Sequence, residues 1–261
     1  MTLRPYVVAF LLVFVVIALR DIGLRGALAF LAWGGAVAFA AEWSSTRVGI
    51  PFGDYRYTGS TAGAELFISN VPLFSPLSFP FLSYAAWCVT RVGLPRLGRT
   101  GGAVAAGLIM MVLDLVIDPL AVRGAHWFLG HLFDYPDGGF YFGVPASNFA
   151  GWVICGTLMV GGALASSRCD CRRLASPWPG VVLYYGVLGF NLGMTLWIGE
   201  IALALAGFVV HAGLFLLLCV GPERVRNFVH SDRMNVDALQ RLPGVDGADA
   251  PLAKARGLSE T

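Results

Sequence analysis

Seven apolar runs, each close to the length of a membrane span, account for most of this chain. A transmembrane helix needs roughly 20 predominantly apolar residues. Only 13% of the residues are charged, whereas a soluble domain carries about 25%. The sequence therefore predicts an all-α, polytopic bundle of about seven transmembrane helices in the cell membrane. The runs cover residues 3–19, 24–42, 67–90, 101–120, 148–166, 178–197 and 201–220.

A polar tail follows the last apolar run. We expect residues 1–221 to form the transmembrane domain and residues 222–261 to form a cytoplasmic tail, disordered in part because it ends in a segment rich in Gly, Ala and Pro. The five cysteines follow no metal-ligand spacing, and Cys169 and Cys171 are expected to be reduced thiols. The chain also lacks a basic cluster with interleaved aromatics, which argues against nucleic-acid binding.

The basic residues are distributed unevenly between the two sides of the predicted bundle. Of the 18 basic residues, fourteen lie in the tail or in the loops after the first, third and fifth runs, against four in the other segments. Cytoplasmic loops carry the excess of Lys and Arg, so we expect the N-terminus outside and the C-terminus in the cytoplasm. The two long loops, about 43–66 and 121–147, then share the non-cytoplasmic side. Their Gly, Pro and aromatic content indicates a lid over the bundle.

Two aspartates stand four residues apart in the fourth apolar run. On a helix this spacing places Asp114 and Asp118 on one face, about 6 Å apart. Two carboxyls in a low-dielectric site cannot easily both ionise, so one is expected to keep a proton that it can give to a substrate. The alternatives are a packing role for Asp114 and an interfacial cap at Asp118, where Pro119 is expected to end the helix.

A third acid, Glu42, closes the second apolar run on the same side. Taken alone it is a weak candidate, because a carboxylate at the membrane interface is commonly just solvated. Arg56, Arg123 and His126 are the counter-charges and proton partners near that face. No histidine has a second ligand at a useful spacing, so we predict no metal site.

Aromatic residues crowd the same predicted face. They are typical of the belt at a membrane interface, and they also fit a pocket whose ring faces stabilise a carbocation. Asn148, at the start of the fifth run, could hold a water there. The aromatics are Trp43, Phe52, Tyr55, Tyr57, Trp127, Phe140, Tyr141, Phe142 and Trp152.

The segments around these residues show a weak internal repeat. The second run ends in an acid, and Val71-Pro72 opens the third; the fourth ends in an acid, and Val144-Pro145 opens the fifth. A duplicated helical hairpin would bring acids from two halves to one site. For so short a match, chance is the simpler explanation.

The motifs also occur in a fixed order along the chain. They are Glu42-Trp43, then Pro51-Phe52-Gly53-Asp54-Tyr55-Arg56-Tyr57-Thr58, then Val71-Pro72-Leu73, then Leu113-Asp114-Leu115-Val116-Ile117-Asp118-Pro119-Leu120-Ala121-Val122, then Tyr141-Phe142-Gly143-Val144-Pro145-Ala146-Ser147-Asn148-Phe149-Ala150-Gly151-Trp152. This ordered set, over about residues 40–155, resembles the integral-membrane carotenoid-biosynthesis proteins, the acyclic carotenoid 1,2-hydratases of the bisanhydrobacterioruberin hydratase type.

The resemblance implies addition of water across the terminal double bond of an acyclic carotenoid, giving a tertiary alcohol. Asp114 or Asp118 would protonate the alkene, and the partner acid or Glu42 would orient and deprotonate the water. Neither step needs a metal, nucleotide or redox cofactor, so no cofactor is expected. The expected partners are a lipophilic acyclic carotenoid, membrane lipid and other enzymes of the carotenoid pathway.

Three other functions stay open. A carotenoid cyclase shares the protonation step and differs in how the cation is quenched. A membrane prenyltransferase would use Asp114 and Asp118 in a magnesium–diphosphate site, but no second acidic motif is present. A carotenoid carrier or transporter would bind pigment unchanged. A retinal protein is excluded, because the only lysine is Lys254 in the tail.

Overall fold

The computed structural model describes residues 4–166 and 176–220, with side chains as far as Leu218. It divides into two units, of which the first extends to Leu214 and contains the first six helices and the first part of the seventh. The helices of the described residues are α1 (Pro5–Asp21), α2 (Gly23–Val48), α3 (Phe74–Gly93), α4 (Arg99–Ala121), α5 (Ala146–Ala165), α6 (Trp178–Trp197) and α7 (Ile201–Val220).

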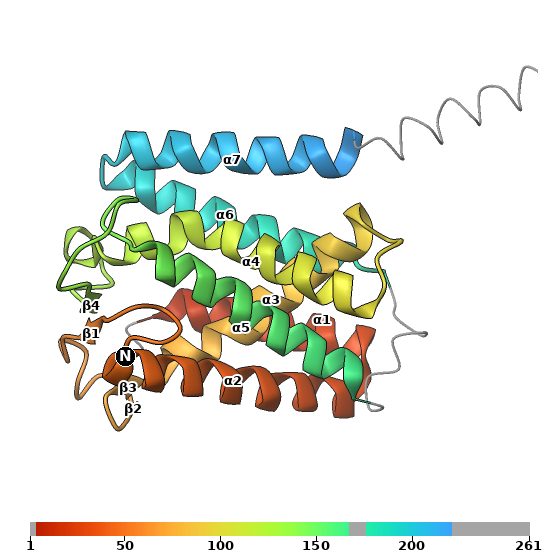
Figure 1. Cartoon of the computed structure of the whole chain (residues 1–261), viewed down its shortest axis with the longest axis horizontal. Helices are drawn as coiled ribbons and strands as arrows, with labels where there is room; N and C mark the ends of the chain where they lie inside the picture. Colours follow the sequence, from red (N-terminus) through yellow and green to blue (C-terminus); the bar gives the residue numbers. More distant parts are fainter. Residues whose placement is uncertain (1–3, 167–175, 221–261) are drawn as a thin grey trace, which may run out of the picture. The chain divides into compact units, whose positions relative to one another are not determined.

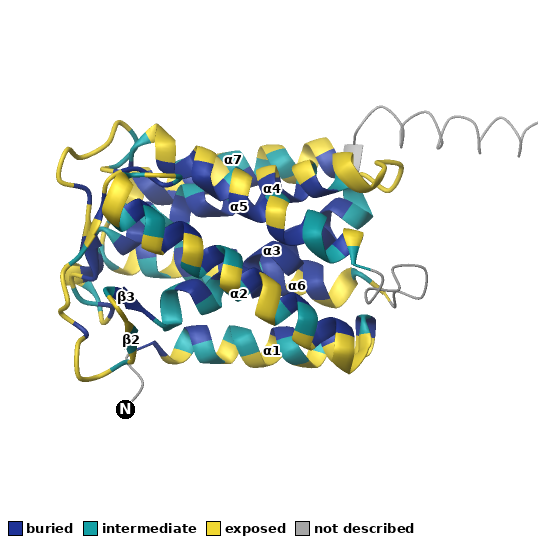
Figure 2. Cartoon of the chain, turned by 60° about the horizontal axis from the view of Figure 1, so that its bottom comes forward, coloured by how far each residue is buried: buried dark blue, intermediate teal, exposed yellow. Residues whose placement is uncertain are grey.

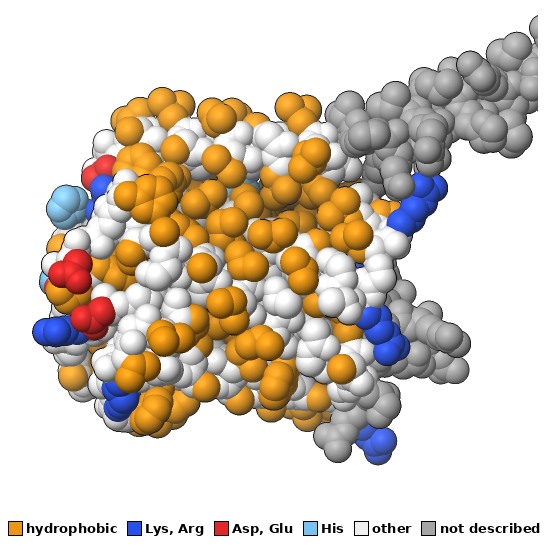
Figure 3. Space-filling view, in the orientation of Figure 1, with side chains coloured by type: hydrophobic (Ala, Val, Ile, Leu, Met, Phe, Trp, Pro, Cys, Tyr) orange, Lys and Arg blue, Asp and Glu red, His pale blue; other side chains and the backbone are white. Residues whose placement is uncertain are grey.

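Five of these helices, α2, α4, α5, α6 and α7, are long and apolar enough to cross a membrane. The prediction of an all-helical chain with several membrane-length apolar helices is therefore confirmed. Helices α1 to α6 run alongside one another (Figure 1). Hydrophobic side chains cover the outward face of α2, α4 and α5, and charged side chains gather at the ends of the helices (Figure 3).

Helix α3 lies at the centre of the first unit and packs against α1, α2, α4, α5 and α6. Every residue from Phe79 to Thr90 is buried, which Figure 2 shows as the dark interior of the bundle. A helix that is apolar on all sides is expected to lie in the core rather than at the surface. This buried segment therefore fixes the position of the first turn of α3 and of the loop before it.

Helices α4 and α5 approach each other closely through glycines. A Cβ atom added at Gly107 would lie 2.5 Å from the carbonyl oxygen of Val153, and one added at Gly156 would lie 2.9 Å from the Cα of Gly107. Small residues at a membrane helix interface let the two backbones come together. This contact places the acids of α4 beside the first turns of α5.

We expect Gly107→Leu to separate α4 from α5, because a side chain there meets backbone atoms that cannot rotate away. Overpacking of this kind costs about 1–3 kcal/mol or more. Thermal unfolding of the purified protein in detergent measures the effect. Gly102→Leu on the same helix is the control, since a Cβ there meets nothing within 4 Å. Equal melting temperatures for the two variants would contradict this account of the interface.

The two long loops meet at one end of the bundle, as predicted (Figure 1). Strand β1 (Arg56–Tyr57) of the first loop pairs with β4 (Phe133–Asp134) of the second in an antiparallel ladder. Within the first loop, β2 (Phe67–Ile68) pairs with β3 (Val71–Pro72). A short 3-10 turn, η1 (Gly124–His126), follows α4.

Three predicted boundaries were wrong. Helix α3 begins at Phe74 rather than near residue 67, because residues 67–72 form a hairpin in which Ser69 has φ 58° and the residue before Pro72 is extended. Helix α2 continues past Glu42 to Val48 and ends at Gly49, which takes the left-handed conformation.

Helix α4 also continues past Asp118, through Pro119, to Ala121. Proline lacks an amide hydrogen, so Pro119 removes one backbone hydrogen bond from the last turn of the helix. The Val122 amide still donates a hydrogen bond to the Asp118 carbonyl at 2.9 Å. The predicted tail 222–261 and the thiols of Cys169 and Cys171 lie outside the described residues.

Candidate active site

The two aspartates of α4 meet a single amide from α5. Asn148, in the first turn of α5, is 1% exposed. Its Nδ2 donates to Asp114 Oδ2 at 2.8 Å and to Asp118 Oδ2 at 2.8 Å. Trp152, one turn further along α5, donates its Nε1–H to the same Asp118 oxygen at 3.1 Å. One side chain thus joins two carboxyls that lie a helical turn apart.

The aspartates differ in burial. Asp114 is fully buried, and its Oδ1 has no hydrogen-bond partner. Asp118 is half-buried and lines the cavities described below. Among the ion pairs found between described side chains, none includes either aspartate. A buried carboxylate without a cation is costly, so this arrangement favours one shared proton on the pair.

Glu42 belongs to a second hydrogen-bonded group, which lines the same cavity as Asp118. It is 2% exposed. The Tyr57 hydroxyl lies 2.8 Å from Glu42 Oε2 and 2.9 Å from the Oγ of Ser75, in the first turn of α3. Because a phenol carries one proton, Tyr57 donates to the Glu42 carboxylate while Ser75 donates to Tyr57. Burial, and then the nearby Glu42, raise the pKa of Tyr57 well above its usual value, which keeps Tyr57 a donor.

Aromatic rings connect the two groups. Phe79 of α3 and Trp152 of α5 are stacked, with ring centroids 4.6 Å apart. Tyr55 and Tyr135, from the two loops, are buried and lie with their centroids 5.8 Å apart. Burial is the main cause that raises the pKa of Tyr135, followed by the charges of Asp118 and Asp114. Tyr135 is therefore another neutral hydroxyl beside the acids.

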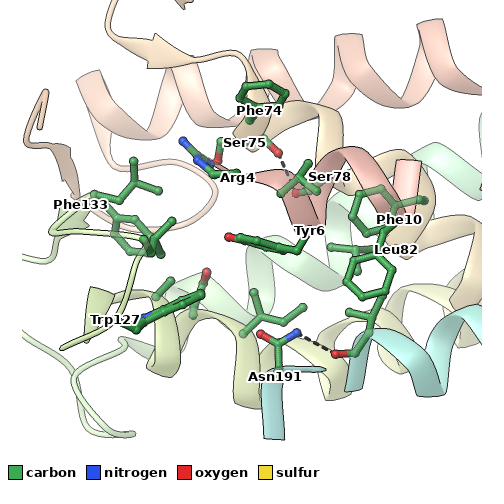
Figure 4. Close-up of a pocket in the computed structure, with 18 residues that line it drawn as sticks. Arg4, Tyr6, Phe10, Phe74, Ser75, Ser78, Leu82, Trp127, Phe133 and Asn191 are labelled. Atoms are coloured by element: carbon green, nitrogen blue, oxygen red, sulfur yellow. Dashed lines mark hydrogen bonds between the residues drawn. The ribbon is translucent and has the colours of Figure 1, made fainter. Parts of the chain in front are cut away.

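Two cavities open onto these groups. The first, which we call the polar cavity, has a volume of about 40 Å³ and is lined by both acid groups and the loop tyrosines. The second, the apolar cavity, has a volume of about 90 Å³ and lies between α1, α3, α4, α6 and the second loop. Figure 4 shows Tyr6, Phe10 and Trp127 around the apolar cavity, with Ser75 and Ser78 at one wall and Asn191 at the opposite wall. The polar cavity is lined by Glu42, Tyr57, Ser75, Asp118, Tyr135 and Asn148, among others.

The structure brings together most of the predicted site residues. Those that line the polar cavity are Glu42, Phe52, Tyr55, Tyr57, Asp118, Asn148 and Trp152, with Asp114 bonded to Asn148 behind them. Trp127 lines the apolar cavity instead. Trp43 is 43% exposed and lies under the guanidinium of Arg47.

The predicted counter-charges lie away from the acids. Arg123 pairs with Glu200 at 2.8 Å and donates to the carbonyl of Phe142 at 2.7 Å. Arg56 is exposed, with Asp54 3.9 Å away, and His126 is exposed on η1. Tyr141 and Phe142 lie in a tight turn of the second loop, where Phe142 has φ 49°. None of these residues lines either cavity.

Sequence reasoning missed Ser75, Phe79, Phe133 and Tyr135, and it missed the parts of α1 and α6 that line the apolar cavity. The internal repeat contained a signal for two of them. Ser75 follows Val71 by four residues, and Asn148 follows Val144 by the same number. Phe79 and Trp152 each follow the corresponding valine by eight residues. The residues of α1 and α6 had no such local signal.

Within the part of the chain that the structure describes, no three His, Cys, Asp or Glu side chains gather closely enough to hold a metal ion. The carboxyls and hydroxyls that line the polar cavity can donate and accept protons.

Comparison with known proteins identifies a relative and a family for this chain. The chain is 29% identical over 187 residues to the bisanhydrobacterioruberin hydratase of Haloarcula japonica, a match that covers 66% of this chain and 59% of that protein. The chain thus spans about three-fifths of the length of that curated relative. No solved structure matches the chain. Residues 4–214 match the carotenoid biosynthesis protein family, so the resemblance seen in the sequence is confirmed and the chain belongs to that family.

Proposed function

We propose that this protein is a carotenoid 1,2-hydratase, which adds water across the terminal double bond of an acyclic carotenoid without a cofactor and gives a tertiary alcohol. The observation that carries the proposal is the pair of Asp114 and Asp118, joined by Asn148 next to one polar and one apolar cavity. Membership of the carotenoid biosynthesis family supports the substrate class. The relative from Haloarcula japonica supports the reaction class.

The first step is protonation of the alkene. The pair of aspartates holds one proton, because two close carboxyls away from bulk water repel as anions. Asp118 delivers it, since Asp118 lines the cavities and Asp114 lies behind. The proton forms a C–H bond at the less substituted alkene carbon, and the π electrons of the double bond leave a tertiary cation at the other carbon.

The second step is quenching of the cation by water. Phe133, which lines both cavities, borders the cation and stabilises its charge by cation–π attraction. A water in the polar cavity forms the C–O bond and loses a proton to Glu42. Glu42 and Asp118 line the same cavity, so the proton returns from one to the other and the cycle closes with no net change in the protein.

The proposal includes a membrane topology in which the seven helices of the described residues cross the bilayer, α1 and α3 in addition to the five of membrane length. The excess of Arg on one side of the predicted bundle favours an N-terminus on the outside. The loops and the acids then lie near the non-cytoplasmic surface. Water reaches them from that side, and a polyene reaches them from the lipid.

Co-expression with a lycopene-producing pathway tests the function. We expect pigments whose mass has increased by one or two waters, detected by chromatography and mass spectrometry. Products of unchanged mass but altered absorption would favour a cyclase. Loss of activity with a chelator would favour a prenyltransferase, and recovery of bound but unmodified pigment would favour a carrier; any of these results would overturn the hydratase proposal.

A further inference from the structure

The polar and apolar cavities share a wall. Three residues line both of them: Ser75, Asp118 and Phe133. A proton donor therefore stands between two compartments rather than at the bottom of one. Hydration needs two reactants of opposite character, an alkene and a water, to meet at one donor.

The two cavities also differ in the number and kind of polar groups that line them. In the apolar cavity, Arg4 pairs with Glu65 at 2.7 Å, the Ser78 hydroxyl donates to the Ser75 carbonyl at 2.7 Å, and Asn191 donates to the Val187 carbonyl at 2.9 Å. Each of these side chains makes a hydrogen bond within the protein, although the buried Nε of Arg4 has no partner. Its remaining lining is largely aromatic and aliphatic, from α1, α3, α4, α6 and the second loop.

In the polar cavity, residues with hydroxyl and carboxyl groups converge from α2, α3, α4 and both loops. Its volume of about 40 Å³ exceeds the roughly 10–15 Å³ that a single water requires on this measure. The Ser75 hydroxyl, the Tyr57 hydroxyl and Glu42 form a continuous chain along one side.

We infer that the apolar cavity holds the terminal isoprenoid unit of the substrate, that the polar cavity holds the attacking water, and that Ser75 is the positioning residue that aims this water at the cation. This inference rests on the proposed hydration. Ser75 is suited to the role because it lines both cavities and its Oγ contacts Tyr57 at 2.9 Å. The proton that the water loses passes to Glu42, directly or through the hydroxyls of Ser75 and Tyr57.

The division of the site predicts a second product when water is misplaced. A tertiary cation that meets no water loses a proton from a neighbouring carbon, and that C–H electron pair forms a new double bond. The proton returns to Asp118, so no other reactant is needed. The result is an isomer of the substrate with the same mass and a shifted double bond, instead of an alcohol.

Ser75→Val and Ser75→Thr form the decisive pair, because the two side chains have nearly the same size and only threonine keeps the hydroxyl. We expect Ser75→Val to lower the ratio of hydrated to isomerised product by about tenfold to a hundredfold, and Ser75→Thr to restore most of it. Ser78→Val is the matched control one turn along α3, since Ser78 lines the apolar cavity and not the polar one. Ser78→Val is expected to change total conversion but not the ratio.

The readout is the ratio of the two products, in cells that make lycopene, with protein amounts measured by immunoblot. Equal ratios for Ser75→Val and Ser75→Thr would overturn the inference, as would an equal shift in Ser78→Val. If Ser75→Val does not accumulate, Tyr57→Phe removes the next hydroxyl without altering α3 and must lower the same ratio. A wild-type protein that produces no alcohol contradicts the proposed function, whereas an active wild type with unchanged variant ratios contradicts only the division of the site.

Discussion

Asp114→Asn should abolish hydration in carotenoid-producing cells while the protein still accumulates in the membrane. Asparagine has the same shape as aspartate, so Asn148 and the helix contacts remain in place. Asp118, however, loses the neighbouring carboxyl that favours retention of a shared proton. It still accepts hydrogen bonds from Asn148 and Trp152, which favour its ionised form. Loss of a general acid lowers a rate by about 10²–10⁴-fold.

The measurement is the yield of alcohol relative to protein amount, with the isomerised polyene quantified in the same extract. Both products should fall together, because no cation forms. Asp137→Asn provides the matched control: this aspartate is exposed in the second loop, and the substitution should leave the yield unchanged. Normal amounts of alcohol from Asp114→Asn would refute the assignment of the acid.

Glu42→Gln should reduce the alcohol by a similar factor, about 10²–10⁴-fold, but for a different reason. Glutamine still accepts a hydrogen bond from Tyr57, but it cannot take a proton from the attacking water. The cation forms normally, since both aspartates are intact. We therefore expect the isomerised polyene to rise as the alcohol falls.

This contrast separates the base from the acid. Glu200→Gln serves as the control, because Glu200 is partly exposed and pairs with Arg123 outside both cavities; its loss is worth at most about 1 kcal/mol. If Glu42→Gln lost both products in parallel, as Asp114→Asn should, Glu42 would act before the cation rather than after it. That outcome would remove Glu42 from the role of base.

The helices were predictable because the signal for each is local. An apolar run long enough to cross the bilayer is stable as a helix, because lipid offers no hydrogen-bond partners and each backbone group must form its hydrogen bond within the segment. The same locality placed Asp114 and Asp118 on one face from their spacing alone. Boundaries were harder: the hairpin before α3 and the extra turns of α2 and α4 depend on Ser69, Gly49 and the contacts of the loops.

The chemistry of the site was predictable only in part. The acids could be selected because a charged side chain at membrane depth is costly, which makes it a candidate for function. The loop aromatics could be selected because they lie on the same predicted face as the acids. Ser75 could not be selected in that way, since a serine near the start of a helix is ordinary. The role that we propose for Ser75 rests on its position between the two cavities and on its contact with Tyr57 of β1.

The amino-acid sequence by itself determined the helical class, the family and the pair of aspartates, because each of these follows from composition, order or spacing along one stretch of chain. Only the tertiary structure decided which groups face one another: that Asn148 joins the aspartates, that Tyr57 connects Glu42 to Ser75, and that α1 and α6 complete the apolar cavity. The physical reason is that these contacts depend on close packing between segments far apart in the sequence, as between Gly107 of α4 and Gly156 of α5. No local sequence pattern encodes the distance between two helices.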